Sequence, residues 1–181
     1  MTIKGLPFFA AGKVVKGFGR GSKQLGIPTA NFPENVVDGL PSSVGAGVYF
    51  GYARVDDGPV HNMVMSIGWN PFYKNEKKSM ETHIMHKFTG DFYGSTLRVC
   101  MVGFIRPEKN FKSLDELIRA INDDIDVAAE LCARPENAAL AKDDFFFQSL
   151  ASTSSGETSD RTTSPEESVI VRSDSEGSIE H

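Results

Sequence analysis

The chain has 181 residues, and its apolar content of 40% is sufficient for the core of one domain. Its formal charge of −5 is concentrated in residues 151–181, where seven acidic and two basic residues leave the first 150 residues neutral overall. Nucleic-acid binding needs clustered basic side chains, so this balance argues against it, and the two cysteines are too few for a disulfide framework. We expect a soluble cytoplasmic protein, with organelle import left open.

Several short segments rich in β-branched, aromatic and methionine residues predict β-strands, because glycine, proline, asparagine and aspartate separate them. The break at residues 56–59 between two of these segments predicts a hairpin turn. Short links favour an antiparallel barrel of five or six strands, since parallel strands would need crossover helices that the first hundred residues do not offer. The predicted strands are 12–18, 45–55, 61–67, 79–86 and 96–105.

An amphipathic helix is predicted after the strands, because apolar residues recur with a 3.6-residue period from position 114 to position 129. Ser113 and Glu116 have the spacing of a capping box at its start, and we expect the helix to pack on the barrel. Serine and threonine then fill 13 of the last 31 positions. This composition predicts one domain over residues 1–150 and a disordered tail over 151–181, mobile unless something docks it.

The glycine-rich stretch 17–32 is the most informative part of the sequence. It is not a dinucleotide-binding fingerprint, because Ser22 stands where a glycine is needed, nor a Walker A loop, because Ile27 follows the last glycine. Closely spaced glycines still let backbone N–H groups approach phosphate oxygens, while Arg20 and Lys23 supply positive charge. The alternative interpretation is a glycine-rich β-hairpin with a polar turn.

Thr29 and Asn31 follow Pro28 at the end of this stretch. In an extended backbone two residues that are separated by one position point to the same face. Their side-chain oxygens are hard, neutral ligands that suit a Mg2+ ion whose other ligands are water and nucleotide phosphates. The pattern therefore predicts a phosphate and metal site on a β scaffold.

The predicted strand around Glu81 offers a candidate catalytic group. Its alternation puts Glu81 and His83 on one face, and a carboxylate fixed on a strand can be aimed at a substrate hydroxyl. The alternative is a surface carboxylate in a salt bridge with Lys77 or Lys78. A zinc site is rejected, because His83 and His86 would face opposite sides of the strand.

The run GFGRGSKQLGIPTANFP, which begins at Gly17, resembles the signature of the riboflavin kinase family, whose Pro-Thr-Ala-Asn motif is intact at positions 28–31. Further segments resemble the family in the same order over roughly residues 7–148, and the resemblance is closest to its eukaryotic, single-function members. These segments are MSIGWNP (65–71), METHIMH (80–86), DFYG (91–94) and RPEKNF (106–111).

The resemblance implies a mainly β fold, a six-stranded antiparallel Greek-key barrel with a C-terminal helix. It implies transfer of the γ-phosphate of ATP to the 5′-hydroxyl of riboflavin, giving FMN and ADP, with Mg2+ as cofactor and Zn2+ or Mn2+ as alternatives. A monomer without nucleic-acid or membrane partners is expected. The implied general base is Glu81; the nucleotide-binding residues are Gly17, Lys23, Thr29, Ile84, His86 and Tyr93; the flavin-binding residues are Arg106, Lys109 and Phe111; the metal-binding residues are Thr29 and Asn31.

Two other functions are weighed against this one. An enzyme that also converts FMN to FAD normally has a separate N-terminal nucleotidyltransferase domain with an H-x-G-H-type motif, which the four histidines here do not form. A non-catalytic flavin-binding barrel would need Glu81 and the predicted metal pair only by accident. Flavin binding without ATP consumption would favour that second alternative.

Overall fold

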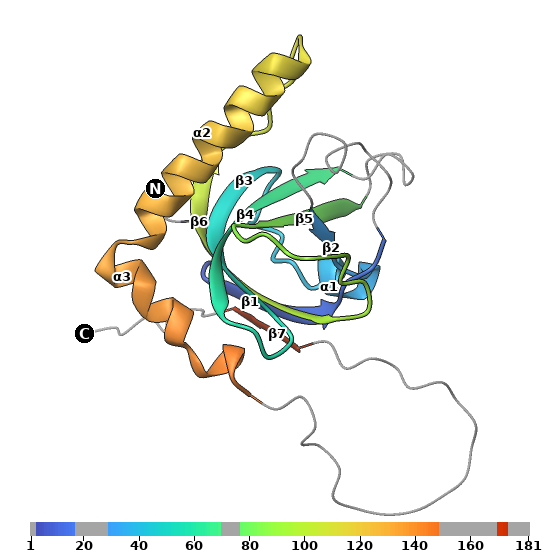
Figure 1. Cartoon of the computed structure of the whole chain (residues 1–181), viewed down its shortest axis with the longest axis vertical. Helices are drawn as coiled ribbons and strands as arrows, with labels where there is room; N and C mark the ends of the chain where they lie inside the picture. Colours follow the sequence, from blue (N-terminus) through green and yellow to red (C-terminus); the bar gives the residue numbers. More distant parts are fainter. Residues whose placement is uncertain (1–2, 17–28, 70–76, 149–169, 174–181) are drawn as a thin grey trace, which may run out of the picture.

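The computed structural model describes residues 3–16, 29–69, 77–148 and the backbone of 170–173. Its centre is one curled antiparallel sheet with the strand order β2-β5-β4-β3-β6-β1-β7 (Figure 1). An isolated bridge between Val15, just after β1, and Asn31 of β2 returns the sheet on itself. The strands are β1 (Phe8–Lys13), β2 (Ala30–Asn31), β3 (Gly47–Val55), β4 (Val60–Trp69), β5 (Lys78–Ile84), β6 (Thr96–Arg106) and β7 (Ile170–Ser173).

The sheet has an apolar inner face that forms the main core. Side chains from alternating positions of the strands fill it, as the period of two in a β-strand requires. On β5, for example, Met80 and Ile84 are buried inside while Glu81 and His83 between them are only partly buried. Burying such apolar surface contributes about 25 cal/mol per Å2, so this face is the main source of stability.

The outer face of the sheet is covered by α2 (Leu114–Cys132), which runs along one side of the sheet (Figure 1). Ser113 caps this helix as predicted, because its hydroxyl accepts a hydrogen bond from the Glu116 N–H at 3.2 Å. The helix is fastened at its other end, where the Tyr52 hydroxyl donates to the Cys132 carbonyl at 2.6 Å. A second apolar cluster that includes Phe50, Tyr52 and Cys132 lies between helix and sheet.

Short helical segments complete the fold, and the chain after α2 continues down the same side of the sheet (Figure 1). Two arginines hold that last segment, since Arg54 donates to the Phe146 carbonyl at 2.6 Å and Arg98 donates to the Gln148 carbonyl at 2.7 Å. None of the helices within the described residues is long and apolar enough to cross a membrane. The short segments are α1 (Glu34–Asp38), α3 (Pro135–Ala138), η2 (Ala139–Lys142) and η3 (Asp144–Phe146).

The predicted antiparallel sheet with a C-terminal helix is confirmed. The short edge strand β2 is an addition to the predicted strands, and two further differences occur at the opposite edge of the sheet. The first strand begins at Phe8 and not at residue 12. Both of its faces are buried, so its sequence lacks the alternation from which a strand is predicted. The second difference is β7, which lies within the predicted tail and pairs antiparallel with β1. The rest of that tail lies outside the described residues.

Candidate functional site

A cavity of about 330 Å3 lies between the outer face of the sheet and α2. Strands β3, β4 and β5 provide one wall, and α2 provides the opposite wall through Leu117, Ile121 and Asp124. The segment that links β6 to α2 closes one end with Glu108, Lys109 and Phe111. Polar or charged residues and apolar residues line the cavity in similar numbers, so it suits a small molecule that carries both kinds of group.

One row of paired residues crosses five strands at this site. Asn31 lies opposite Glu81, Glu81 opposite Ser66, Ser66 opposite Val48, and Val48 opposite Arg106. Directly paired residues share a face of the sheet, so all five point to the outer face. Neighbouring strands are about 4.8 Å apart, which puts Glu81 and Arg106 roughly 14 Å from each other along the row. The site is thus elongated, with different chemistry at its two ends.

The first end of the cavity is formed by Thr29, Glu81 and His83. The predicted alternation of β5 is confirmed, because Thr82 is buried on the other face of the strand while Glu81 and His83 line the cavity. Asn31 does not line the cavity but lies directly opposite Glu81 on β2. This end therefore brings together a carboxylate, a hydroxyl, an amide and an imidazole.

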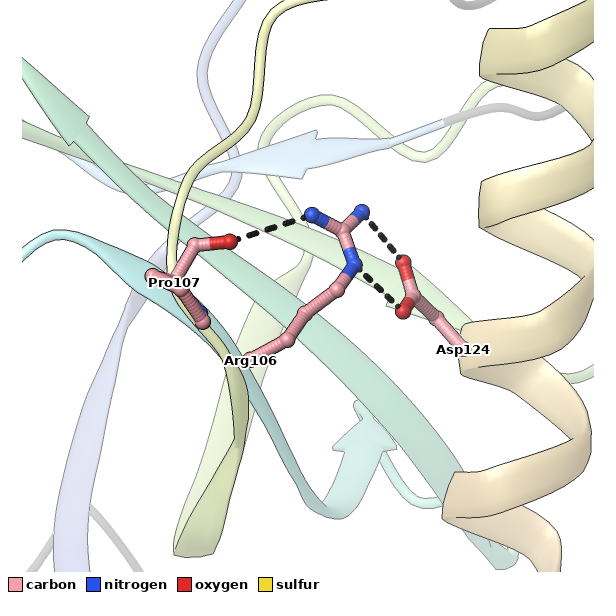
Figure 2. Close-up of polar contacts among 3 residues, drawn as sticks. All are labelled: Arg106, Pro107 and Asp124. Carbon is pink, nitrogen blue, oxygen red and sulfur yellow. Dashed lines mark hydrogen bonds and ion pairs between the residues drawn. The ribbon is translucent and has the colours of Figure 1, made fainter.

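The second end of the cavity is organised around Arg106. Its Nε and Nη2 donate to the two carboxylate oxygens of Asp124, both at 2.8 Å, and Nη1 donates to the Pro107 carbonyl at 3.2 Å (Figure 2). The guanidinium carbon lies 5.7 Å from the centre of the Phe111 ring, and the Lys109 ammonium lies 5.9 Å from the same ring. The three predicted flavin-binding residues are thus neighbours.

The predicted nucleotide-binding residues do not all meet in this cavity. Ile84 is buried in the inner core, and the ring of His86 stacks on that of His61 with centroids 4.2 Å apart. Tyr93 is 48% exposed, with the Lys16 ammonium 5.9 Å from its ring centre. Burial and the neighbouring His86 lower the pKa of His61. Of the remaining predictions, Gly17 and Lys23 lie outside the described residues.

Sequence reasoning did not find Asp124, although its position carried a signal. It lies on the face of α2 that also bears Ile121 and Ala128, where an ionised side chain is costly unless it is paired. An acidic residue inside an apolar helical stripe predicts a buried partner, which is Arg106. The sequence alone could not identify that partner, because 18 positions separate the two residues.

The fold and the elongated cavity are those of a small curled β-sheet domain that binds a small molecule under a helix. The family model Flavokinase, described as riboflavin kinase, matches residues 4–132, and the chain belongs to this family. The predicted resemblance is therefore confirmed.

Individual relatives agree with the family match. A riboflavin kinase of Mus musculus is 63% identical over 146 residues, which cover 81% of this chain and 94% of that protein. One of Homo sapiens is 60% identical over 144 residues, covering 80% and 93%. The crystal structure of riboflavin kinase from Trypanosoma brucei has a TM-score of 0.64 and 28% identity, and it covers 81% of this chain and 92% of that one. The chain is thus an enzyme with riboflavin kinase activity, which uses ATP to convert riboflavin to FMN.

Proposed function

We propose that the γ-phosphate of ATP passes directly to the 5′-hydroxyl of riboflavin, and that Glu81 accepts the proton of this hydroxyl. The observation that supports this most strongly is the row of paired residues, because it puts Glu81 and Arg106 at opposite ends of one cavity. A flavin that extends along the row has its ring at one end and the end of its ribityl chain at the other. Glu81 is then the carboxylate beside the reacting hydroxyl.

The ring of riboflavin binds in this proposal at the end formed by Arg106, Lys109 and Phe111. An aromatic side chain beneath two cationic groups suits a flat conjugated ring with polar edges. The apolar residues Leu117 and Ile121 of α2 face the same cavity and exclude water from the ring. These residues bind and orient the substrate, while the chemistry takes place at the other end.

ATP approaches from the side of β5 and β2 in this proposal. Thr29 and Glu81 both line the cavity, and the chain after β5 leads to His86 and Tyr93. The stacked rings of His61 and His86 offer an aromatic surface near that path. Thr29, His86 and Tyr93 are proposed to contact the nucleotide, together with Gly17 and Lys23. Ile84, which is buried in the inner core, is proposed to support this site from inside.

The residues at the Glu81 end fit a metal ion that is held mainly by phosphates. Thr29 and Asn31 offer neutral oxygens next to Glu81, and no group of three or more metal-ligating side chains of the His, Cys, Asp or Glu type occurs in the described part of the chain. Thr29 and Asn31 would hold Mg2+, with Zn2+ or Mn2+ as alternatives. A bound ion supplies charge neutralisation of the phosphates.

Glu81→Gln tests the reaction, because it keeps the shape of the side chain and removes the base. We expect turnover of riboflavin to fall by about 100-fold or more, which is the usual contribution of a general base. Turnover is measured by separating riboflavin, FMN and FAD after incubation of the protein with riboflavin, ATP and Mg2+. For the wild-type chain we expect FMN without FAD. Glu130→Gln is the matched control, since the Glu130 side chain is 77% exposed on α2. Near-normal turnover in Glu81→Gln would exclude Glu81 as the base.

A further inference from the structure

The guanidinium of Arg106 is held in one orientation by three hydrogen bonds. Both carboxylate oxygens of Asp124 accept from it at 2.8 Å, and the Pro107 carbonyl accepts at 3.2 Å (Figure 2). An arginine has five N–H donors, so two remain for a substrate. Paired donors on one edge fix the plane of the guanidinium, and this leaves the free N–H groups with a defined direction.

Asp124 is 4% exposed, and both of its oxygens are occupied by Arg106. A carboxylate in the apolar stripe of a helix is costly, and a stripe residue such as leucine or isoleucine would pack there without this cost. An apolar residue at position 124 would therefore stabilise the fold more than the ion pair does. Its geometric consequence is that α2 fixes the side chain of Arg106 at the wall of the cavity.

The pair also lowers the net charge at this end of the cavity, where Glu108 and Lys109 are the other charged lining residues. Asp124 neutralises Arg106, so the guanidinium acts there as an oriented hydrogen-bond donor with little net charge. Such a donor suits the uncharged carbonyl oxygens of a flavin ring. Without Asp124 the long arginine side chain would have several rotamers, and the directed donors would be lost.

We infer that Asp124 is a positioning residue for riboflavin. It lines the cavity, but both of its carboxylate oxygens already accept from Arg106, so it acts through that side chain. This inference rests on the proposed role of Arg106 at the ring end of the cavity. Because the reacting hydroxyl lies at the other end, Asp124 affects the binding of riboflavin and not the chemical step.

The test compares Asp124→Asn, Arg106→Met and the double variant in steady-state kinetics with riboflavin and ATP varied separately. We expect each single variant to raise KM for riboflavin about 10-fold, within the range of coupling energies for residues of one network. The double variant should match Arg106→Met, because Asp124 has no effect once Arg106 is absent. In all three, kcat and KM for ATP should stay within about twofold of wild type, since the reacting end is unchanged.

Asp123→Asn is the matched control, because Asp123 precedes Asp124 on α2 and is exposed. Circular dichroism and the melting temperature establish that each variant is folded, and the double variant leaves no unpaired buried charge. An unchanged riboflavin KM in Asp124→Asn, with a raised KM in Arg106→Met, would overturn this inference alone. The inference would also be overturned if the increases in riboflavin KM of the two single variants multiplied in the double variant. An unchanged KM in Arg106→Met would overturn both the inference and the proposed flavin role of Arg106.

Discussion

The inner and outer faces of the curled sheet are built from the same strands, but their side chains differ in chemistry. On β5 the inward residues Met80, Thr82 and Ile84 are buried, whereas Glu81 and His83 line the cavity on the outer face. The inner face is almost entirely apolar, and the outer face combines an apolar part under the end of α2 with a polar part at the site. Adjacent residues of one strand therefore belong alternately to the buried core and to the lining of the cavity.

This difference shows how a small barrel separates stability from substrate binding. The period of two in a β-strand sends neighbours to opposite faces, so a polar residue can enter the site without entering the core. Substitutions on the inner face should change mainly the free energy of unfolding, and substitutions on the outer face of the site should change mainly kinetics. Unfolding and kinetic measurements on single variants test this separation.

Met80→Ala and Glu81→Gln form the strongest contrast, because these residues are neighbours on β5. We expect Met80→Ala to lower the free energy of unfolding by about 2–5 kcal/mol, since it removes a fully buried side chain. Glu81→Gln should lower kcat while it changes the free energy of unfolding by less than Met80→Ala does. Denaturant unfolding and the kcat of the folded fraction measure the two effects. A large loss of kcat in folded Met80→Ala would break the separation.

Thr29→Ala and Asn31→Ala test the metal-binding part of the outer face. Each removes one neutral oxygen ligand, so the Mg2+ concentration for half-maximal activity should rise. The rise should be about 10-fold or more, because changing even the residues that support a metal ligand has an effect of this size. Excess Mg2+ should restore part of the activity, unlike in Glu81→Gln. An unchanged Mg2+ titration in either variant would remove that residue from the proposed metal site.

Thr82→Val sharpens the comparison on the inner face. The hydroxyl of Thr82 is fully buried and has no hydrogen-bond partner within the described part of the chain. Its replacement by a methyl group should raise the free energy of unfolding by about 1 kcal/mol, because an unsatisfied buried hydroxyl is unfavourable. Thermal and denaturant unfolding measure this change. A loss of stability instead would mean that the hydroxyl has a partner in solution, such as a bound water.

His61→Phe should change the dependence of stability on pH. The pKa of folded His61 lies below the ordinary value of about 6.5, because burial and His86 disfavour its charged form. The unfolded chain therefore binds the proton more readily than the folded chain. Stability is lost as the pH falls from about 6.5 toward the lower pKa of folded His61. Phenylalanine cannot titrate, and the variant should lose less stability in acid. Equal acid losses in variant and wild type would contradict this prediction.

Much of the fold could be predicted from the sequence because its strands alternate or end at clear turns. The turn before β4 is an example, since Asp56 has a positive φ of 47° and its carboxylate accepts from the Thr96 N–H at 2.8 Å. The cap of α2 by Ser113 could also be predicted, because helix capping depends on residues that are close together in the sequence. β1 was located only in part, since a strand that is buried on both faces has no alternation to read.

The site was predictable only as far as its residues belonged to one strand or one motif. The orientation of Glu81 followed from alternation, whereas Arg106, Lys109 and Phe111 were named by the family resemblance. Pairing of β2 with β5 and of α2 with the end of β6 depends on the tertiary fold. For that reason neither the position of Asn31 opposite Glu81 nor the role of Asp124 could be derived from the sequence.

The central claim is that the cavity holds the flavin ring near Arg106 and the reacting hydroxyl near Glu81. Lumiflavin has the ring without the ribityl chain, and its binding can be measured from the change in flavin fluorescence. We predict that Arg106→Met weakens lumiflavin binding by about 10-fold, the scale expected for a residue of one contact network, and that Glu81→Gln leaves it unchanged. Equal weakening by both variants, or weakening by Glu81→Gln alone, would contradict the two-ended arrangement.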